Sequence, residues 1–184
     1  MIPEAALSGL RVLDFGWVWS GPLVATTLAE FGAEVIKVEH GQRLDNSRLR
    51  GRPLRDGRPA EGPSIEISPL FHQTNHGKRS ITVNMKAAKG IALLQQLAAE
   101  SDVILENLTP GVLARVGLGY EELCTRNPRL VMLSMSAAGQ RGPLSGMRAY
   151  APIMSSFCGL EALVGYPGEA PMGMMNFGYG DPNA

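Results

Sequence analysis

Five short apolar segments, separated by stretches with helical periodicity, set the strongest limit on what this chain can fold into. The segments span residues 11–15, 34–39, 80–84, 102–106 and 130–135. Their nearly continuous apolar runs are typical of strands buried on both faces, and the stretches between them space apolar side chains three or four residues apart. This alternation predicts an α/β fold: a Rossmann-like open parallel sheet with right-handed crossovers and helices on both faces.

The expected helices carry recognisable end signals. Ser20 is a suitable N-cap for the first helix, Pro22 falls in its first turn, and Gly32 marks its end. Further helical segments are expected over 87–100, in a turn that begins at Pro110, over 120–125 and over 150–164. The chain therefore begins with a β-α-β unit.

Residues 41–77 interrupt the alternation. They form a long Arg-rich excursion that also holds many glycines and prolines and lacks a sustained period. In a compact domain such a segment is usually either functional or mobile. The sequence leaves open whether it is a solvated loop, a lid or a subunit contact.

The charge balance excludes several kinds of partner. Lys plus Arg and Asp plus Glu number 17 each among 184 residues, so no bulk charge attracts nucleic acid or an acidic membrane surface. No stretch approaches the roughly 20 apolar residues of a membrane span, and no signal-peptide pattern opens the sequence. The two cysteines, Cys124 and Cys158, lack metal-ligand spacing. We expect a cytoplasmic protein without nucleic-acid or membrane partners.

The connection after the first strand is a candidate binding loop, because open parallel sheets bind ligands beyond the carboxyl ends of their strands. Its Gly16-Trp-Val-Trp-Ser-Gly21 lacks the spacing of the dinucleotide-binding G-x-G-x-x-G motif, and no Walker A loop is present. Trp17 and Trp19 instead lie beside a helix N-terminus, where indoles can stack on a heterocycle and free N–H groups can face an anion. The alternative is that both tryptophans pack in the core.

Basic residues recur near the ends of later strands, at Lys86, Arg115 and Arg148. Such side chains can converge on phosphates, although each alone is more typical of a solvated surface charge. His72 and His76 have the i, i+4 spacing of a metal-binding pair, but they lie in a Thr-Asn-Gly loop without the glutamate of the zinc-protease motif. No metal site is therefore predicted.

Asp181 is the candidate nucleophile. It lies on a short connection that Gly178 and Gly180 free of bulky neighbours. Glycine permits positive φ and close approach of the backbone to a ligand, so this carboxylate can be presented to a substrate. A carboxylate can attack an activated acyl group and form a mixed anhydride. Aspartate before proline is also ordinary turn chemistry, and the local sequence does not separate the two interpretations.

The order of these segments resembles that of the class III CoA-transferases, the family of formyl-CoA and carnitine CoA-transferases. The resemblance covers essentially the whole chain, and it is specific because many short blocks occur in the right order at the right separations. The blocks are Leu7-Ser-Gly-Leu-Arg-Val-Leu-Asp14, Gly21-Pro22, Phe31-Gly-Ala-Glu-Val-Ile-Lys-Val-Glu39, Lys78-Arg-Ser80, Val103-Ile-Leu-Glu-Asn107 with Pro110-Gly111, Gly117-Leu-Gly-Tyr120, Asn127-Pro-Arg129, Gly139-Gln140 with Gly142-Pro143, and Gly180-Asp181.

The resemblance implies an activity and its substrates. In the family, the aspartate that matches Asp181 attacks an acyl-CoA thioester to give a mixed anhydride. The CoA thiolate then returns to form an aspartyl-CoA thioester, and CoA passes to an acceptor carboxylic acid. The implied substrates are an acyl-CoA and a carboxylic acid, and no cofactor is bound permanently. Aspartate suits this role because it is ionised near neutral pH and needs no general base.

The resemblance also implies a set of CoA contacts. By position these are Trp19, Ser20, His40, Val83, Asn84, Met85, Lys86, Asn107, Leu108, Thr109, Arg115, Arg148 and Tyr150. Three positions depart from the family pattern. Trp19 stands where the formate-transferring branch has glutamine, His40 replaces an arginine, and Ala151 occupies a position that is commonly acidic.

The family fold is longer than this chain. The resemblance implies that residues 1–184 are the N-terminal part of the large CoA-binding α/β domain, that the second domain is absent, and that the fold is incomplete relative to the family. Full-length relatives form interlocked homodimers. Two alternatives stay open. One is an α-methylacyl-CoA racemase of the same fold, disfavoured because Ala149-Tyr150-Ala151 replaces the racemase Gly-His-Asp. The other is a catalytically incomplete CoA-binding fragment or subunit.

Overall fold

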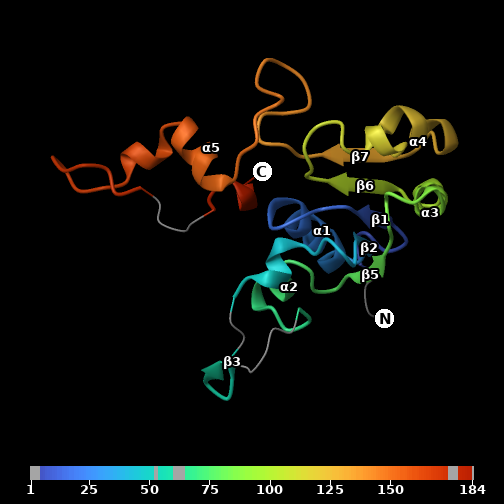
Figure 1. Ribbon diagram of the computed structural model, residues 1–184, viewed down its shortest axis with the longest axis horizontal. Coiled ribbons are helices and arrows are strands. Elements are labelled where there is room, and N and C mark those ends of the chain that lie inside the picture. The colour runs from blue at the N-terminus through green and yellow to red at the C-terminus, as the bar shows by residue number, and fades with distance from the viewer. Residues whose placement is uncertain (1–4, 52–53, 60–64, 174–177, 184) are drawn as a thin grey trace.

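The computed structural model describes residues 5–51, 54–59, 65–173 and 178–183. Its centre is a five-stranded sheet in the order β5-β2-β1-β6-β7, and every neighbouring pair is parallel (Figure 1). The strands are β1 (Arg11–Asp14), β2 (Glu34–Glu39), β5 (Arg79–Thr82), β6 (Val103–Glu106) and β7 (Val131–Ser134). The open parallel sheet predicted from the apolar runs is therefore confirmed.

Each face of the sheet has its own core, because successive side chains of a strand point to opposite sides. Val12 of β1 packs on one face in a cluster that includes residues of α1 (Ser20–Glu30). Its neighbour Leu13 packs in a second cluster with residues of α3 (Ala88–Ala99) and α4 (Tyr120–Arg126). Helices therefore cover both faces, as the sequence predicted.

The Arg-rich excursion contains more regular structure than its sequence indicates. Its elements are η1 (Asn46–Leu49), an antiparallel pair formed by β3 (Leu54–Arg55) and β4 (Arg58–Pro59), and α2 (Pro69–Gln73). Asp45, Ser47 and Phe71 are buried, whereas β3 and β4 are exposed and lie away from the sheet (Figure 1). The excursion is thus anchored through residues near both of its ends.

The single helix expected over 150–164 is wrong, because the segment is broken in two. The α-helix α5 covers Ala151–Phe157, and a 3-10 turn, η3, covers Leu160–Leu163. Gly159 between them has a φ of 79°, in the left-handed region that ends helices. In the sequence, Gly159 resembles a tolerated glycine inside a run of small residues, but in the structure it ends the helix.

Beyond β7 the chain leaves the sheet. Residues 142–173 are here called the arm; α5 and the part of the arm that follows it extend to one side of the molecule (Figure 1). The chain then returns so that η4 (Asp181–Asn183) contacts α1. A further 3-10 turn, η2 (Ala114–Val116), precedes α4. Within the described ranges, no helix has the length and apolarity to cross a membrane, and no group of three or more metal-ligating side chains occurs.

Candidate active site

A pocket of about 410 Å³ opens at the carboxyl ends of β1, β6 and β7, with η4 at one side. This is the edge where open α/β sheets bind ligands. The lining residues are Trp17, Val18, Trp19, Ser20, Asn107, Leu108, Thr109, Met135, Ser136, Ala137, Ala149, Tyr150, Ala151, Met154, Gly180 and Asp181. Both tryptophans line this pocket and are partly exposed, so the alternative that they pack in the core is wrong.

Residues 16–19, here called the β1 loop, are tied to the strand next to β1 by Asn107. The side-chain oxygen of Asn107 accepts a hydrogen bond from the Trp17 N–H at 2.7 Å. Its amide nitrogen donates to the Trp17 carbonyl at 2.8 Å and to the Ser20 hydroxyl at 3.1 Å. A Cβ atom on Gly21 would lie 2.9 Å from this side chain, so glycine is required there. One amide therefore orients both the loop and Ser20.

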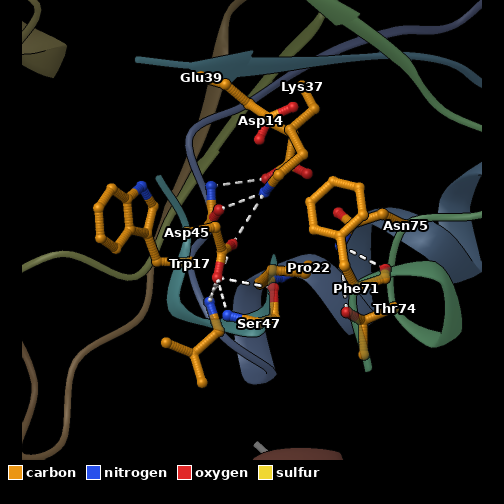
Figure 2. A network of polar contacts seen from close by, with 12 residues as sticks. Asp14, Trp17, Pro22, Lys37, Glu39, Asp45, Ser47, Phe71, Thr74 and Asn75 are labelled. Atoms are coloured by element: carbon orange, nitrogen blue, oxygen red, sulfur yellow. Dashed lines mark hydrogen bonds and ion pairs between the residues drawn. The ribbon is translucent and has the colours of Figure 1, made fainter. Parts of the chain in front are cut away.

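A buried ion pair holds the same loop (Figure 2). The Lys37 ammonium donates to the Gly16 carbonyl at 2.7 Å and lies 3.5 Å from the Asp45 carboxylate, and both charged side chains are 2 % exposed. The Val18 N–H donates to both Asp45 oxygens at 3.2 Å. Val18 has a φ of 63°, which is unusual for a β-branched residue. The β1 loop thus has an uncommon backbone conformation, and two buried charged side chains bind it directly.

A second buried pair joins β1 to α1 and to the excursion. The Lys78 ammonium donates to Asp14 Oδ2 at 2.9 Å, to the Pro22 carbonyl at 2.8 Å and to Asn75 Oδ1 at 3.0 Å. The other Asp14 oxygen accepts from the Gly16 N–H at 2.6 Å. Burial lowers the pKa of Lys78 to about 8, and the Asp14 carboxylate acts in the opposite direction. Three acceptors satisfy the three ammonium hydrogens, so the buried charge is fully paired.

Asp181 is half-buried at the pocket wall, against the N-terminus of α1. The Ser20 hydroxyl and the Ser20 N–H both donate to its carboxylate. Burial raises the pKa of Asp181 above its ordinary value, and these two hydrogen bonds act to lower it. The net result is a carboxylate that is more basic than usual and is held by a helix N-terminus, where free N–H groups favour negative charge. This combination suits a nucleophile.

The glycines that flank Asp181 contribute unequally. A Cβ atom on Gly178 would lie 2.7 Å from the Trp19 indole and 3.0 Å from an Asp181 carboxylate oxygen, so only glycine fits. Around Gly180 there is open space, and its φ is not in the left-handed region. The close approach expected of both glycines is therefore a property of Gly178 alone.

The residues expected to contact CoA fall into two sets. One set lines the pocket and comprises Trp19, Ser20, Asn107, Leu108, Thr109 and Tyr150. The other lies outside the pocket lining and comprises His40, Val83, Asn84, Met85, Lys86, Arg115 and Arg148.

Within the second set, three residues meet after β2 and β5. His40 Nε2 lies 3.1 Å from Asn84 Oδ1, and the Lys86 N–H donates to the same oxygen at 2.9 Å. The Val83 side chain is buried in the core and Met85 packs against it, so Val83 can offer a ligand only its main chain. The remaining two members, the exposed arginines at 115 and 148, lie on the segments that follow β6 and β7.

The sequence alone did not single out several residues of the site. Met135 ends the strand predicted over 130–135, and Ser136 and Ala137 follow it, so the strand-end rule contained a signal for them. Lys37 also had a signal, since a lysine within a buried strand needs a partner. Asp45 had none, because it lies in the aperiodic excursion.

Comparisons with known proteins agree with this geometry. The family described as CoA-transferase family III matches residues 7–183. A succinate–glutarate CoA-transferase from Agrobacterium fabrum is 37% identical over 90% of this chain and 41% of its own length. The alpha subunit of a succinyl-CoA–L-malate CoA-transferase from Chloroflexus aurantiacus is 38% identical over 92% of this chain and 38% of its own length.

Solved structures give the same result. A CAIB/BAIF family protein from Brucella suis superposes with a TM-score of 0.84 at 32% identity, over 97% of this chain and 46% of that protein. The chain therefore belongs to CoA-transferase family III, as its sequence blocks predicted. It spans about two fifths of the length of the curated relatives that it matches.

Proposed function

We propose that this chain carries the nucleophile and part of the CoA site of an acyl-CoA:carboxylate CoA-transferase. The observation that carries the proposal is Asp181: a half-buried carboxylate of raised pKa, bound by two Ser20 donors, at the wall of a pocket on the ligand-binding edge of the sheet. Membership of the family and the names of its relatives support transfer of CoA between an acyl-CoA and an acid.

The proposed chemistry proceeds through two kinds of covalent intermediate, an aspartyl-CoA thioester and mixed anhydrides of Asp181, first with the donor acyl group and later with the acceptor. An Asp181 oxygen attacks the thioester carbonyl, the C–S bond breaks, and a mixed anhydride and CoA thiolate form. The thiolate attacks the Asp181 carbonyl, releases the donor acid as a carboxylate, and leaves an aspartyl-CoA thioester. An acceptor carboxylate then attacks this thioester and displaces CoA thiolate. Attack of the thiolate on the acceptor's acyl carbon gives the new acyl-CoA and frees Asp181.

We propose that the two sets of predicted contacts bind different parts of CoA. The pocket, with Asn107, Leu108 and Thr109 in its lining, suits the thioester and the pantetheine arm that carries it. The set outside the pocket lining, with His40, Asn84, Lys86, Arg115 and Arg148, suits the phosphates, because Lys and Arg side chains make charge-assisted hydrogen bonds to phosphate oxygens. The interlocked homodimer and the second domain of full-length relatives remain predictions from the resemblance.

Trapping with hydroxylamine tests the proposal. Incubation with succinyl-CoA and hydroxylamine is expected to convert the Asp181 carboxyl into a hydroxamate, because hydroxylamine attacks the activated aspartyl carbonyl and releases CoA or the acid. Mass spectrometry of the peptide that carries Asp181 detects the product. Asp181→Ala is expected to abolish it while CoA binding persists.

The exposed Asp56 provides an internal control, since its peptide should stay unmodified in the same digest. CoA binding without any Asp181 hydroxamate would replace the transferase proposal with that of a non-catalytic CoA-binding chain. Exchange of the α-hydrogen of a 2-methylacyl-CoA for deuterium, again without hydroxamate, would favour the racemase.

A further inference from the structure

Five main-chain polar groups of the β1 loop bind side chains from other parts of the protein or from β1 itself. The Gly16 N–H binds Asp14, and the Gly16 carbonyl binds Lys37. The main-chain N–H and carbonyl of Trp17 both bind Asn107. The Val18 N–H binds Asp45. A loop that only connected two elements would leave such groups to solvent. The concentration of buried partners indicates that the conformation itself is required.

Asp45 is the one of these anchors that comes from the excursion. It lies in the excursion and is 3 % exposed, and besides the Val18 N–H it accepts hydrogen bonds from the Ser47 N–H at 2.9 Å and the Ser47 hydroxyl at 2.7 Å. Lys37 supplies the compensating charge at 3.5 Å. The Asp45 carboxylate therefore faces the N–H of Val18, a residue in the left-handed region.

We infer that Asp45 and Lys37 are positioning residues for the Asp181 site, because their ion pair holds Val18 in the left-handed conformation that places Trp19 and Ser20 against Asp181. The inference rests on the proposed function of Asp181. It gives the anchored part of the excursion a role in the site, although none of the described residues of the excursion lines the pocket.

A third ion pair, Arg48–Glu39, is largely buried and supplies a matched control. Arg48, also in the excursion, binds Glu39 through two hydrogen bonds of 2.8 and 2.7 Å, and both side chains are 9 % exposed. This pair also contacts the Ile65 carbonyl and the Ser80 hydroxyl. Among the hydrogen bonds of the described residues, none joins it to residues 16–20. Weakening it disturbs a buried charge pair without touching the β1 loop.

Asp45→Asn is the informative substitution. The amide keeps the size of the carboxylate but replaces one acceptor oxygen with a donor, and each oxygen of Asp45 now faces N–H or ammonium donors. Whichever way the amide turns, a donor meets a donor. The Val18 N–H or the Lys37 ammonium is then released, whereas Glu39→Gln weakens the Arg48–Glu39 pair and breaks no hydrogen bond of the β1 loop.

Tryptophan fluorescence measures the loop without requiring activity. Trp17 and Trp19 are the two tryptophans of the chain, and both belong to the β1 loop. Asp45→Asn is expected to shift their emission and raise quenching by acrylamide, whereas Glu39→Gln leaves both as in the wild type. Should Asp45→Asn fold poorly, Ser47→Ala removes one donor to Asp45 and is expected to give a smaller change of the same sign. Unchanged emission and unchanged quenching in both Asp45→Asn and Ser47→Ala would overturn the inference.

The rate of Asp181 hydroxamate formation measures the consequence for the site. At saturating acyl-CoA, Asp45→Asn is expected to slow labelling by about tenfold or more, since small displacements of positioned groups have large kinetic effects. The apparent KM is expected to change by less than about threefold, as befits a residue that does not touch substrate. Val18→Gly in the Asp45→Asn background is expected to recover part of the rate, because glycine adopts positive φ freely.

The pH profile adds a readout that simple destabilisation does not move. Labelling requires ionised Asp181 and is lost as pH falls through its pKa. Ser20 donors hold that pKa down against burial, so their displacement moves the acid limb of the profile to higher pH in Asp45→Asn. Tyr150 is the other titratable side chain among the described residues that line the pocket.

The outcomes separate the two claims. A wild type that forms no hydroxamate refutes the proposed function, and with it the positioning role. A wild type that reacts while Asp45→Asn reacts equally fast with the same acid limb refutes only the positioning role. A Glu39→Gln variant that loses as much rate as Asp45→Asn also refutes it, because the effect would then be one of general stability.

Discussion

The two walls of the pocket are built in different ways. The wall formed by the β1 loop and Asn107 is fixed by buried hydrogen bonds and two buried ion pairs. The wall formed by the arm contributes Tyr150, Ala151 and Met154, and the arm exposes large apolar side chains such as Phe157 and Leu163. The group expected to react therefore lies against the first, preorganised wall, and we propose that the arm forms a more adaptable wall for other parts of a ligand.

The largest expected effect is on the preorganised wall. Lys78→Met leaves the Asp14 carboxylate buried without its cation, which is expected to lower the free energy of unfolding by about 3–5 kcal/mol. The adjacent Arg79 pairs with Glu34 but is 78 % exposed, so Arg79→Met is expected to cost less than about 1 kcal/mol. Denaturant unfolding measures both. Equal losses of unfolding free energy in Lys78→Met and Arg79→Met would show that burial of the ion pairs does not distinguish the preorganised wall.

An intermediate effect is expected where the walls meet. Gly178→Ala brings a Cβ atom into the Trp19 indole and the Asp181 carboxylate, so we expect a loss of about 1–3 kcal/mol and slower hydroxamate formation. Gly146→Ala is the control, because the space around Gly146 is open and its φ is not in the left-handed region. Thermal unfolding and labelling of both variants make the comparison. A Gly178→Ala variant as reactive as wild type would mean that Trp19 moves freely.

The smallest effect on stability is expected in the arm. Met154→Ala truncates a partly buried side chain of the adaptable wall, and we expect it to cost about 1 kcal/mol or less and to raise the KM for acyl-CoA more than it lowers the rate of labelling. The exposed neighbour Ile153, changed to alanine, is expected to leave both constants as they are. A large fall in labelling rate at saturating substrate in Met154→Ala would show that the arm also positions reacting groups.

The sequence predicted the framework of the fold and half of the site. Hydrophobic periodicity and the residues that mark helix ends suffice to predict the sheet, the helices on both of its faces and its ligand-binding edge, because these features depend on local sequence patterns. The resemblance supplied Asp181 and the pocket residues around it. The break at Gly159 was missed because a glycine in an apolar run has no distinctive pattern until its φ is known.

The Lys37–Asp45 pair could not be read from the sequence for a different reason. A lysine within a buried strand requires a counter-charge, but the chain offers many carboxylates and no local rule selects one. Asp45 becomes the partner only when the excursion folds back onto the sheet. The left-handed Val18 follows from that contact, and intrinsic preference would have argued against it.

The hydrogen bonds between Trp17 and Asn107 span 90 positions of the sequence. Bringing together residues so far apart in the sequence carries an entropic penalty, which is offset only once β6 pairs with β1. We therefore expect the β1 loop to become fixed late in folding. While the chain is being synthesised, a stretch that ends before Asn107 contains Trp17 and Trp19 but lacks the side chain that fixes their loop. A ribosome-bound intermediate of that length would expose an aromatic surface to chaperones.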